Sequence, residues 1–414
     1  MTLGRTRRAA HVGHVRVSER GRFCWALGVA VLSRLFIFAV GLGARTAVPI
    51  LHPRAMILAD PSLLYRGTAG RLLNGWTNVD AGWYLSIAQH GYAHRFSQAF
   101  FPLYPLAVGL LARIGPGYVL AGIGLSLACF VGAATLLYRV TADALDTRMA
   151  LWTVVFLSIA PTSFFYQAVY TESLFLFLSV AVFFLAQRQR WLLAGLAGLL
   201  ASLTRSTGVV LAAPFVLFYL GSVDWQWRRI RADIAWVLLV PVGLAVYMAY
   251  LWRTQGDPML FAHVEHRWHR FFTAPWTTLR QGFDYGYLGA AHIIGGGGLT
   301  HLGALLWQSS VDMVNAQNAL VLAVVTAVIV LGWRRLTLPY NAYAALALLF
   351  TLVNPERHEP LVSLPRYMVV VFPLFMAVAA VTEGRPRTRV AITAASIVGL
   401  AWLTARFVVF AWVA

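Results

Sequence analysis

Residues 23–43 read FCWALGVAVLSRLFIFAVGLG, an apolar run with a single charge, Arg34, near its middle. About 20 such residues suffice for a helix to cross a bilayer. The run is longer than the roughly 7 to 15 residue core of a cleaved signal peptide, and an Arg-rich start precedes it. We therefore predict an uncleaved first membrane helix with the basic tail, residues 1–22, in the cytoplasm.

The composition extends this prediction to the whole chain. Of 414 residues, 59% are hydrophobic and 12% are charged, whereas a soluble domain carries about 25% charged residues. Further apolar runs follow as far as 390–413, so we predict an all-α polytopic membrane protein with about eleven transmembrane helices in one domain, 23–414. The cysteines, Cys24 and Cys129, lie in apolar runs and indicate neither a disulfide framework nor a metal cluster.

The net charge of +18 comes from 33 basic residues, all of them Arg, against 15 acids. In a soluble domain this excess would suggest nucleic acid. Here most of the Arg falls in short segments between apolar runs, where it sets membrane topology, and we predict no nucleic-acid partner. With the N-terminus inside, the Arg-rich turns are cytoplasmic if residues 101–114 lie along the outer surface without crossing. The long segments 44–117 and 253–315 then face the outside.

The first of these outer segments contains the run NVDAGWYLSIAQHGY at residues 78–92. An acid beside the membrane is costly and often functional, so Asp80 is a candidate catalytic base. The alternative is that Asp80 only caps the helix that begins at Ala81. Trp83, Tyr84 and His90 are candidates for contacting a sugar, although interfacial aromatics are expected without any ligand.

Three further polar residues fall on the same predicted side: Glu172, Arg205 and Arg366. A carboxylate that takes a proton from a hydroxyl, together with guanidinium groups that hold a phosphate, would suit a lipid-linked sugar phosphate. Glu172 could instead complement a helix dipole, and each Arg could extend to the membrane interface. Arg34 could reach a phosphate or pair within the protein.

The run HVEHRWHR places His263, His266 and His269 three residues apart, with Arg267 among them. A zinc site is one interpretation, but the HExxH pattern is missing. A helix whose His and Arg side chains meet a phosphate or sugar is another, and a solvated basic face is a third. We predict no metal-ligating residues and no cofactor beyond a lipid-linked sugar that serves as co-substrate, and a requirement for a divalent metal stays open.

Six motifs in order, VDAGWYLSIAQHGY, FFPLYPL, YTESLF, SLTRSTG, GDPMLF and PRYMVVVFPLF, resemble the bacterial branch of the PIG-V family. Its eukaryotic members add the second mannose in GPI-anchor assembly. The resemblance implies a GT-C-type fold and a polyprenyl-phosphate sugar used on the non-cytoplasmic side. It also implies that Asp80 is the presumed base and Glu172 the acid of the second motif. The family usually has Trp where this sequence has Val79.

These observations predict a mannosyltransferase that inverts the donor's anomeric carbon. Its partners would be the bilayer, a polyprenyl-phosphate sugar donor, and a lipid or glycan acceptor on the extracytoplasmic side of the cell membrane. The alternative is a transporter or flippase of a lipid-linked sugar. Transporters tend to show internal repeats and midplane polar sites, and neither is evident in this sequence. Asp80 and Glu172 facing one outer cavity would favour transfer, whereas a two-sided pathway would favour transport.

Overall fold

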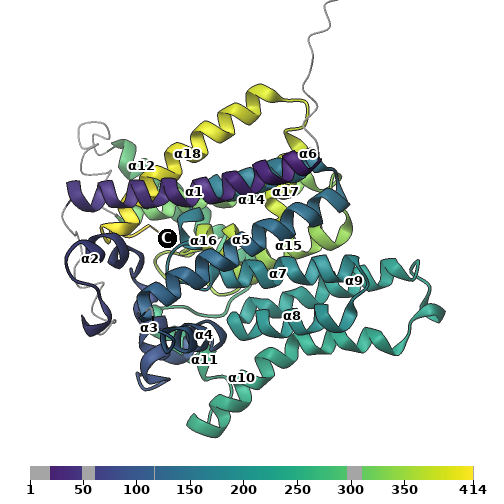
Figure 1. The fold of residues 1–414 in the computed structure, drawn as a ribbon, viewed down its shortest axis with the longest axis horizontal. Helices are drawn as coiled ribbons and strands as arrows, with labels where there is room; N and C mark the ends of the chain where they lie inside the picture. Colours follow the sequence, from purple (N-terminus) through teal and green to yellow (C-terminus); the bar gives the residue numbers. More distant parts are fainter. Residues whose placement is uncertain (1–18, 49–60, 116, 296–309, 414) are drawn as a thin grey trace, which may run out of the picture.

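The computed structural model describes residues 19–48, 61–115, 117–295 and 310–413 (Figure 1). Within these ranges all regular structure is helical, and extended pairing is limited to one antiparallel bridge between Arg270 and Glu356. The prediction of an all-α protein is confirmed. The helices are α1 Glu19–Ala47, α2 Gly67–Leu73, α3 Asp80–His90, α4 Leu103–Ala112, α5 Tyr118–Ala144, α6 Thr147–Ile159, α7 Glu172–Gln187, α8 Trp191–Thr204, α9 Ala212–Ser222, α10 Leu239–Gln255, α11 Leu260–His263, α12 Pro275–Gly295, α14 Val311–Gly332, α15 Leu338–Leu352, α16 Leu364–Val369, α17 Pro373–Val381 and α18 Pro386–Val408. Short 3-10 turns lie at Pro61–Leu63, Asn74–Trp76, Ser97–Ala99, Ser163–Tyr166, Ser206–Leu211, Trp227–Arg229, Ala232–Leu238 and Val264–Trp268.

In the described parts of the chain, five helices are long and apolar enough to cross a membrane: Glu19–Ala47, Tyr118–Ala144, Ala232–Gln255, Val311–Gly332 and Pro386–Val408. Six shorter apolar helices, of 10 to 17 residues, accompany them. The eleven predicted runs are therefore helical, but fewer than half form a single full-length helix. The structure is of a membrane-protein type, and the exact number of crossings stays a prediction.

The segment predicted not to cross forms α4, which has 10 residues. At about 1.5 Å per residue it is roughly 15 Å long, about half of the hydrocarbon core. A single helix of this length does not reach across the core, and its position along the outer surface stays a prediction.

The tenth predicted run, 364–381, divides into two helices, α16 and α17. Pro373 begins α17 and carries no N–H for a helical hydrogen bond, so the helix cannot continue through it. The break leaves α16 as a short helix that holds Arg366 in a buried position. The tenth span is therefore a broken helix with a charged residue inside the bundle.

The central helices pack in sequence, with α7 against α5 and α8, and α8 against α10. Small residues allow this close approach. A Cβ at Gly243 of α10 would collide with the Leu199 carbonyl of α8, and one at Gly198 would collide with Val240. Close helix packing through glycine is typical of membrane bundles.

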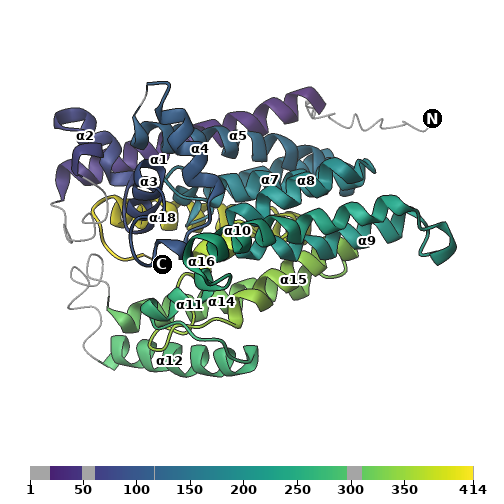
Figure 2. The same cartoon turned by 90° about the horizontal axis from the view of Figure 1, so that it is seen from below.

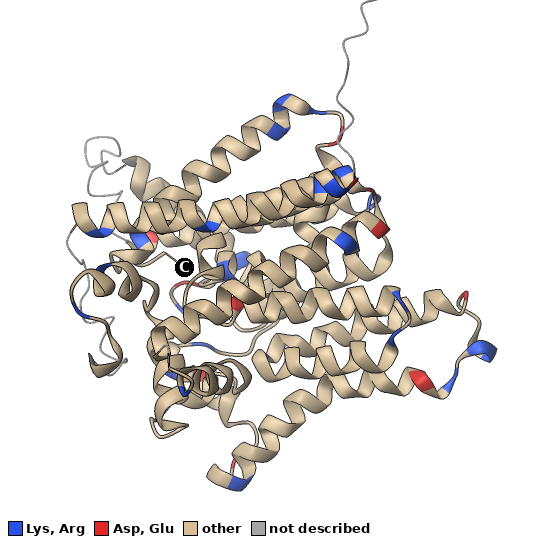
Figure 3. Ribbon diagram, in the orientation of Figure 1, with Lys and Arg blue, Asp and Glu red and all other residues tan. Residues whose placement is uncertain are grey.

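Arginines gather at one end of the bundle, on the right in Figures 1 and 3. They lie in the turns between α5 and α6, α7 and α8, α9 and α10, α14 and α15, and α17 and α18. Helices α3, α4 and α11 lie toward the opposite end (Figure 1). This asymmetry agrees with the positive-inside pattern. The cytoplasmic N-terminus remains a prediction, and residues 1–18 of the basic tail lie outside the described residues.

The predicted outer segment 253–315 contains one long helix, α12, in addition to α11. Helix α12 runs beside α14 along one edge of the molecule (Figure 2). Its 21 residues were predicted only as part of an outer loop. Residues 49–60 and 296–309 of the two outer segments lie outside the described residues.

Candidate functional site

A cavity of about 620 Å³, here called the first cavity, lies where several helix ends meet. Asp80 lines it from the start of α3, Arg205 from the turn after α8, and Arg366 from α16. The segments 265–270 and 354–363 form other parts of its wall. Its volume lies in the usual range of small-molecule sites, about 300 to 1,000 Å³.

Arg366 joins the two predicted catalytic acids. Its Nη1 donates to a carboxylate oxygen of Asp80, and its Nε donates to Oε1 of Glu172. Arg205 donates to the same Glu172 oxygen at 3.2 Å. The Glu172 side chain is 0% exposed, whereas that of Asp80 is 23% exposed. The four residues predicted from separate motifs therefore form one ion-pair network, with Asp80 as its more accessible acid.

Both acids stand at the first residue of a helix, Asp80 in α3 and Glu172 in α7. The positive end of a helix dipole stabilises a carboxylate there. This agrees with the capping and dipole interpretations, and the network adds a role that those interpretations do not require.

Val79, the residue at which the sequence departs from the family pattern, precedes Asp80 with a φ of 47° and also lines the first cavity. Positive φ is strained for a β-branched residue. Backbone strain of this kind concentrates at functional sites. The strained turn fixes the direction in which α3 presents Asp80 to the cavity.

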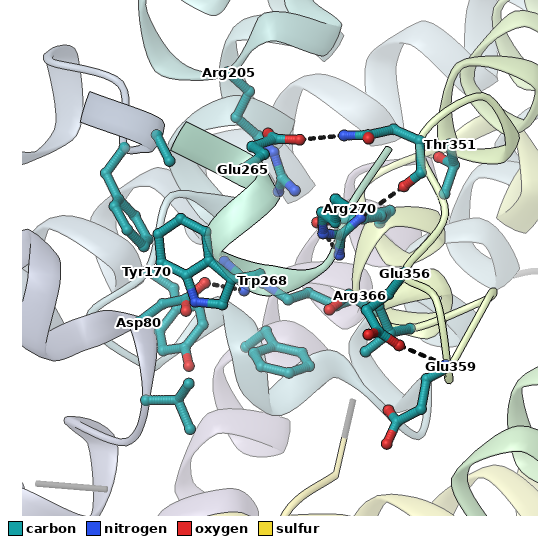
Figure 4. A pocket seen from close by; sticks show the side chains of 18 of the residues that line it. Asp80, Tyr170, Arg205, Glu265, Trp268, Arg270, Thr351, Glu356, Glu359 and Arg366 are labelled. Atoms are coloured by element: carbon teal, nitrogen blue, oxygen red, sulfur yellow. Dashed lines mark hydrogen bonds and ion pairs between the residues drawn. The ribbon is translucent and has the colours of Figure 1, made fainter. Parts of the chain in front are cut away.

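Aromatic rings surround the charges. The Arg366 guanidinium lies 4.4 Å from the Tyr170 ring, whose hydroxyl donates to the Asn78 carbonyl at 2.8 Å. Burial raises the pKa of Tyr170 well above its ordinary value, so the phenol stays a neutral donor. Figure 4 shows Tyr170 beside Asp80. Tyr170 belongs to the YTESLF motif, but the sequence analysis assigned it no role.

Arg34 lies away from the first cavity. Its guanidinium donates to the carbonyls of Ser163 at 2.6 Å and Ser158 at 2.8 Å, and lies 4.3 Å from the Phe130 ring. Of the two interpretations left open, this position supports pairing within the protein. Arg34 ties α1 to the turn that follows α6.

Among the predicted substrate-binding residues, Tyr84 and Arg267 line the first cavity. Trp83 stacks on Phe100 behind the cavity wall, at 5.4 Å. His90 lies at the exposed C-terminal end of α3. These positions of Trp83 and His90 give no support to direct contact with a sugar in this cavity.

The histidine cluster does not form one continuous α-helix, because α11 ends at His263 and a 3-10 turn follows. His263 is exposed and pairs with Asp257 at 2.7 Å, and the His266 ring turns back to the His263 carbonyl. Neither of these two rings lines the first cavity, whereas His269 does. In the described parts of the chain, groups of three or more His, Cys, Asp or Glu placed to hold a metal do not occur.

Sequence reasoning missed four residues of the cavity wall: Trp268, Arg270, Glu356 and Glu359. Figure 4 shows Trp268 and Arg270 between the Asp80 side of the cavity and the side formed by the two glutamates. A signal for the glutamates exists in the run NPERHEP at 354–360, since four charged or ionisable residues in seven are unusual in this apolar chain. In the run HVEHRWHR the predicted contacts were the His residues and Arg267, and the neighbouring Trp268 and Arg270 were not predicted.

Glu359 has the most perturbed carboxyl in the loops around the cavity. Burial raises its pKa to about 7, and the nearby charge of Glu356 adds to the shift. Glu356 is itself held by the backbone N–H groups of His358 at 2.7 Å and Glu359 at 2.5 Å. Glu359 therefore titrates near neutral pH at the edge of the first cavity.

Comparison with known proteins gives the class to which this arrangement is related. A family model described as Mannosyltransferase (PIG-V) matches residues 29–223. This range contains Asp80, Glu172 and Arg205, so the predicted resemblance to PIG-V is confirmed there.

Individual relatives agree with this class. The chain is 34% identical over 200 residues to GPI alpha-1,6-mannosyltransferase 2 of Mus musculus, and the match covers 44% of this chain and 40% of the relative. It is 27% identical over 271 residues to GPI mannosyltransferase 2 of Drosophila pseudoobscura pseudoobscura, covering 58% and 59%. The fission yeast Schizosaccharomyces pombe has a GPI mannosyltransferase 2 that is 25% identical over 279 residues, covering 61% and 57%. The matches thus span about half the length of these relatives, and a bacterial branch stays a prediction.

Solved structures with a similar arrangement are also known. ArnT from Cupriavidus metallidurans bound to undecaprenyl phosphate is 14% identical, with a TM-score of 0.48, covering 88% of this chain and 62% of that one. The Archaeoglobus fulgidus oligosaccharyltransferase in its apo form is 14% identical, with a TM-score of 0.44, covering 94% and 56%.

Proposed function

We propose that this protein is a membrane glycosyltransferase of GT-C type, from a bacterial branch of the PIG-V family. It transfers mannose from a polyprenyl-phosphate donor to a lipid or glycan acceptor on the extracytoplasmic side of the cell membrane. The observation that carries the proposal is the network in which Arg366 links Asp80, at the wall of the first cavity, to Glu172. The match to the Mannosyltransferase (PIG-V) model supports the choice of sugar.

The reaction in this proposal is a single displacement. An acceptor hydroxyl oxygen forms a bond to the anomeric carbon, while the bond from that carbon to the donor phosphate oxygen breaks. Asp80 takes the hydroxyl proton, and the phosphate leaves with the bonding electrons toward Arg366 and Arg205. Attack opposite to the leaving group inverts the anomeric carbon.

Glu172 acts in this scheme through its partners. It is fully buried and holds both guanidinium groups, so it positions Arg366 and Arg205 and has no direct route to substrate. Positioned cations stabilise the charge that develops on a leaving phosphate. When the donor phosphate contacts Arg366, it competes with Asp80 for that guanidinium, and this leaves the carboxylate better able to accept a proton.

Of the two acids, Asp80 lines the first cavity, whereas Glu172 is buried behind it and is joined to Asp80 through Arg366. The proposal of transfer over transport is supported by this accessible acid beside paired arginines. A direct test incubates membranes that contain the overexpressed protein with labelled polyprenyl-phosphate mannose and follows label into lipid and polymer fractions. Positioned general-base catalysis contributes about 100-fold to 10,000-fold. Asp80→Asn should lower turnover by a factor in this range, whereas the matched variant Asp224→Asn, in the turn after α9 with a 72% exposed side chain, should not. Transfer that persists at most of its rate in folded Asp80→Asn would overturn the mechanism.

A further inference from the structure

A second cavity, of about 450 Å³, adjoins the first. The five described residues that line it are His269, Arg270, Phe271, Gln281 and Arg357. None of these is acidic, and two carry a permanent positive charge. In contrast, the lining of the first cavity includes four acids and four arginines. The second cavity therefore differs from the first in chemistry as well as position, because it favours an anion.

The wall between the two cavities is a short antiparallel pairing of two distant segments. Phe271 donates its N–H to the Pro355 carbonyl and Arg357 donates to the His269 carbonyl, both at 3.2 Å, on either side of the Arg270 to Glu356 bridge. Side chains alternate in such a pairing. Accordingly Glu356 lines the first cavity only and Arg357 the second only, while Arg270 contacts both.

The charges of Arg270 and Arg357 are not neutralised by acids within the described ranges. The Arg270 guanidinium donates to two neutral groups, the Asn354 carbonyl at 3.0 Å and the Tyr367 hydroxyl at 3.3 Å. The Tyr367 ring centroid lies 5.8 Å from the Arg270 guanidinium and 5.1 Å from that of Arg205, on the side of the first cavity.

An apolar stripe accompanies the second cavity. Trp276, Phe283, Tyr287 and Ile294 of α12 are 72%, 57%, 75% and 79% exposed. Their spacing places all four within about 20° of one line along the helix, at roughly 100° per residue. A different face, with Gly282, Gly286 and Gly289, packs against the protein. Helix α12 lies at an edge of the molecule (Figure 2), so the stripe faces away from α14.

An exposed aromatic and aliphatic stripe is typical of a surface in contact with lipid. Its first residue, Trp276, lies five residues after Phe271, which lines the second cavity. Gln281, another lining residue, lies about 140° around α12 from the stripe at roughly 100° per residue. A ligand that matches both features has a long hydrocarbon chain and one phosphate group. A free phosphate would leave the stripe unexplained, and a neutral lipid would leave the cationic cavity unexplained.

We propose that α12 and the second cavity form the docking site of a polyprenyl phosphate carrier, with the chain along the Trp276 to Ile294 stripe and the phosphate at Arg357 and Arg270. This inference rests on the proposed transferase function for the identity of the carrier. Because Arg270 contacts both cavities, a sugar attached to the bound phosphate extends into the first cavity toward Asp80. The assignment adds Arg270 and Arg357 to the donor-binding residues.

Binding of the carrier phosphate is measured without turnover, by native mass spectrometry of the detergent-purified full chain. The probes are a long polyprenyl phosphate, farnesyl phosphate, a long polyprenol and dioctanoyl phosphatidylglycerol. The variants are Arg357→Gln and a matched control away from α12, Arg229→Gln, whose side chain is 57% exposed and pairs with Asp224 at 2.7 Å. Each variant is first compared with the wild type in thermal unfolding.

We expect the long polyprenyl phosphate to bind the wild type more tightly than the polyprenol or phosphatidylglycerol does. Loss of one charge-assisted hydrogen bond to phosphate should weaken carrier binding roughly ten-fold in Arg357→Gln, whereas binding to Arg229→Gln should equal that of the wild type. The double variant Phe283→Ser and Tyr287→Ser should bind the long polyprenyl phosphate more weakly than the wild type does. Binding of farnesyl phosphate, whose chain is too short to cover the stripe, should be nearly unaffected.

Three results would overturn the assignment. Equal losses of carrier binding in Arg357→Gln and Arg229→Gln would show general charge attraction only. If phosphatidylglycerol bound as tightly as the long polyprenyl phosphate, the site would accept phospholipids in general. If the polyprenol bound as tightly, the phosphate would not contribute to binding. Failure of the transferase proposal would appear differently, as carrier binding with the expected pattern but without mannose transfer.

Discussion

Replacing Arg366 with Gln removes the central charge of the network while keeping a side chain that donates hydrogen bonds. Glu172, which is 0% exposed, would keep only Arg205 at 3.2 Å. Breaking a buried ion pair by removing one partner costs about 3–5 kcal/mol. Because Arg205 still offsets part of the Glu172 charge, we expect a loss of about 3 kcal/mol in the free energy of unfolding, at the lower end of that range.

A second substitution separates charge from packing. Glu172→Gln in the Arg366→Gln background removes the stranded buried charge, and we expect it to restore roughly 2 kcal/mol, a coupling typical of residues in one network. Asp80→Asn in the same background should restore less, because the Asp80 side chain is 23% exposed and water already screens its charge.

The assay is denaturant unfolding of the purified variants in one detergent, followed by tryptophan fluorescence. Arg335→Gln is the matched control, since its partner Glu383 lies at 3.8 Å and both side chains are about half exposed, at 55% and 48%. An exposed pair contributes about 0–1 kcal/mol. If Arg366→Gln loses no more stability than Arg335→Gln, the buried-charge reasoning is refuted.

Three further predictions follow from single residues. The pKa of Glu359 is raised from 4.5 to about 7, so the folded state holds a proton that the unfolded state releases; melting temperature should fall as the pH rises from about 5 to about 7, and Glu359→Gln should flatten that fall. Arg34→Met removes the side-chain donor of the Ser163 carbonyl and one of the two side-chain donors of the Ser158 carbonyl, which should lower the free energy of unfolding by about 1–3 kcal/mol. The KM of Arg34→Met for the sugar donor, measured on folded protein, should equal that of the wild type. A raised KM in a variant as stable as the wild type would contradict the placement of Arg34 away from the cavity. Val79→Gly relieves a φ of 47°, so the melting temperature should hold or rise while kcat falls; a clearly lower melting temperature would exclude strain at this position.

Hydropathy predicted where helices form, because runs of apolar residues in a bilayer must satisfy their own backbone hydrogen bonds. It predicted the length of a crossing less well. The run at 150–166 became α6, which ends at Ile159 before Pro161, and the run at 364–381 broke before Pro373. Both interruptions follow from proline chemistry that a hydropathy average does not register.

The acids and arginines of the network were identifiable because each is a rare charge at the end of an apolar run. Their partnership was not, since Arg366 lies 286 residues from Asp80 and 194 from Glu172 in the sequence. The stripe of α12 was visible in principle as aromatic residues at helical spacing. It escaped notice because Asp284, Arg280 and several glycines lower the hydropathy of that segment.

The charges that line the first cavity bear on where the donor phosphate binds. The first cavity is lined by four acids and four arginines, and Arg366 and Arg205 are already paired with Glu172 and Asp80. Arg270 is one of those four arginines, and within the described ranges its guanidinium donates only to neutral groups. A phosphate at Arg366 and Arg205 must compete with the acids that already hold them, whereas Arg270 and Arg357 offer positive charge without such competition, from a wall formed by segments about 85 residues apart. This difference argues that the carrier phosphate docks first from the side of α12 and contacts Arg366 as the sugar is transferred.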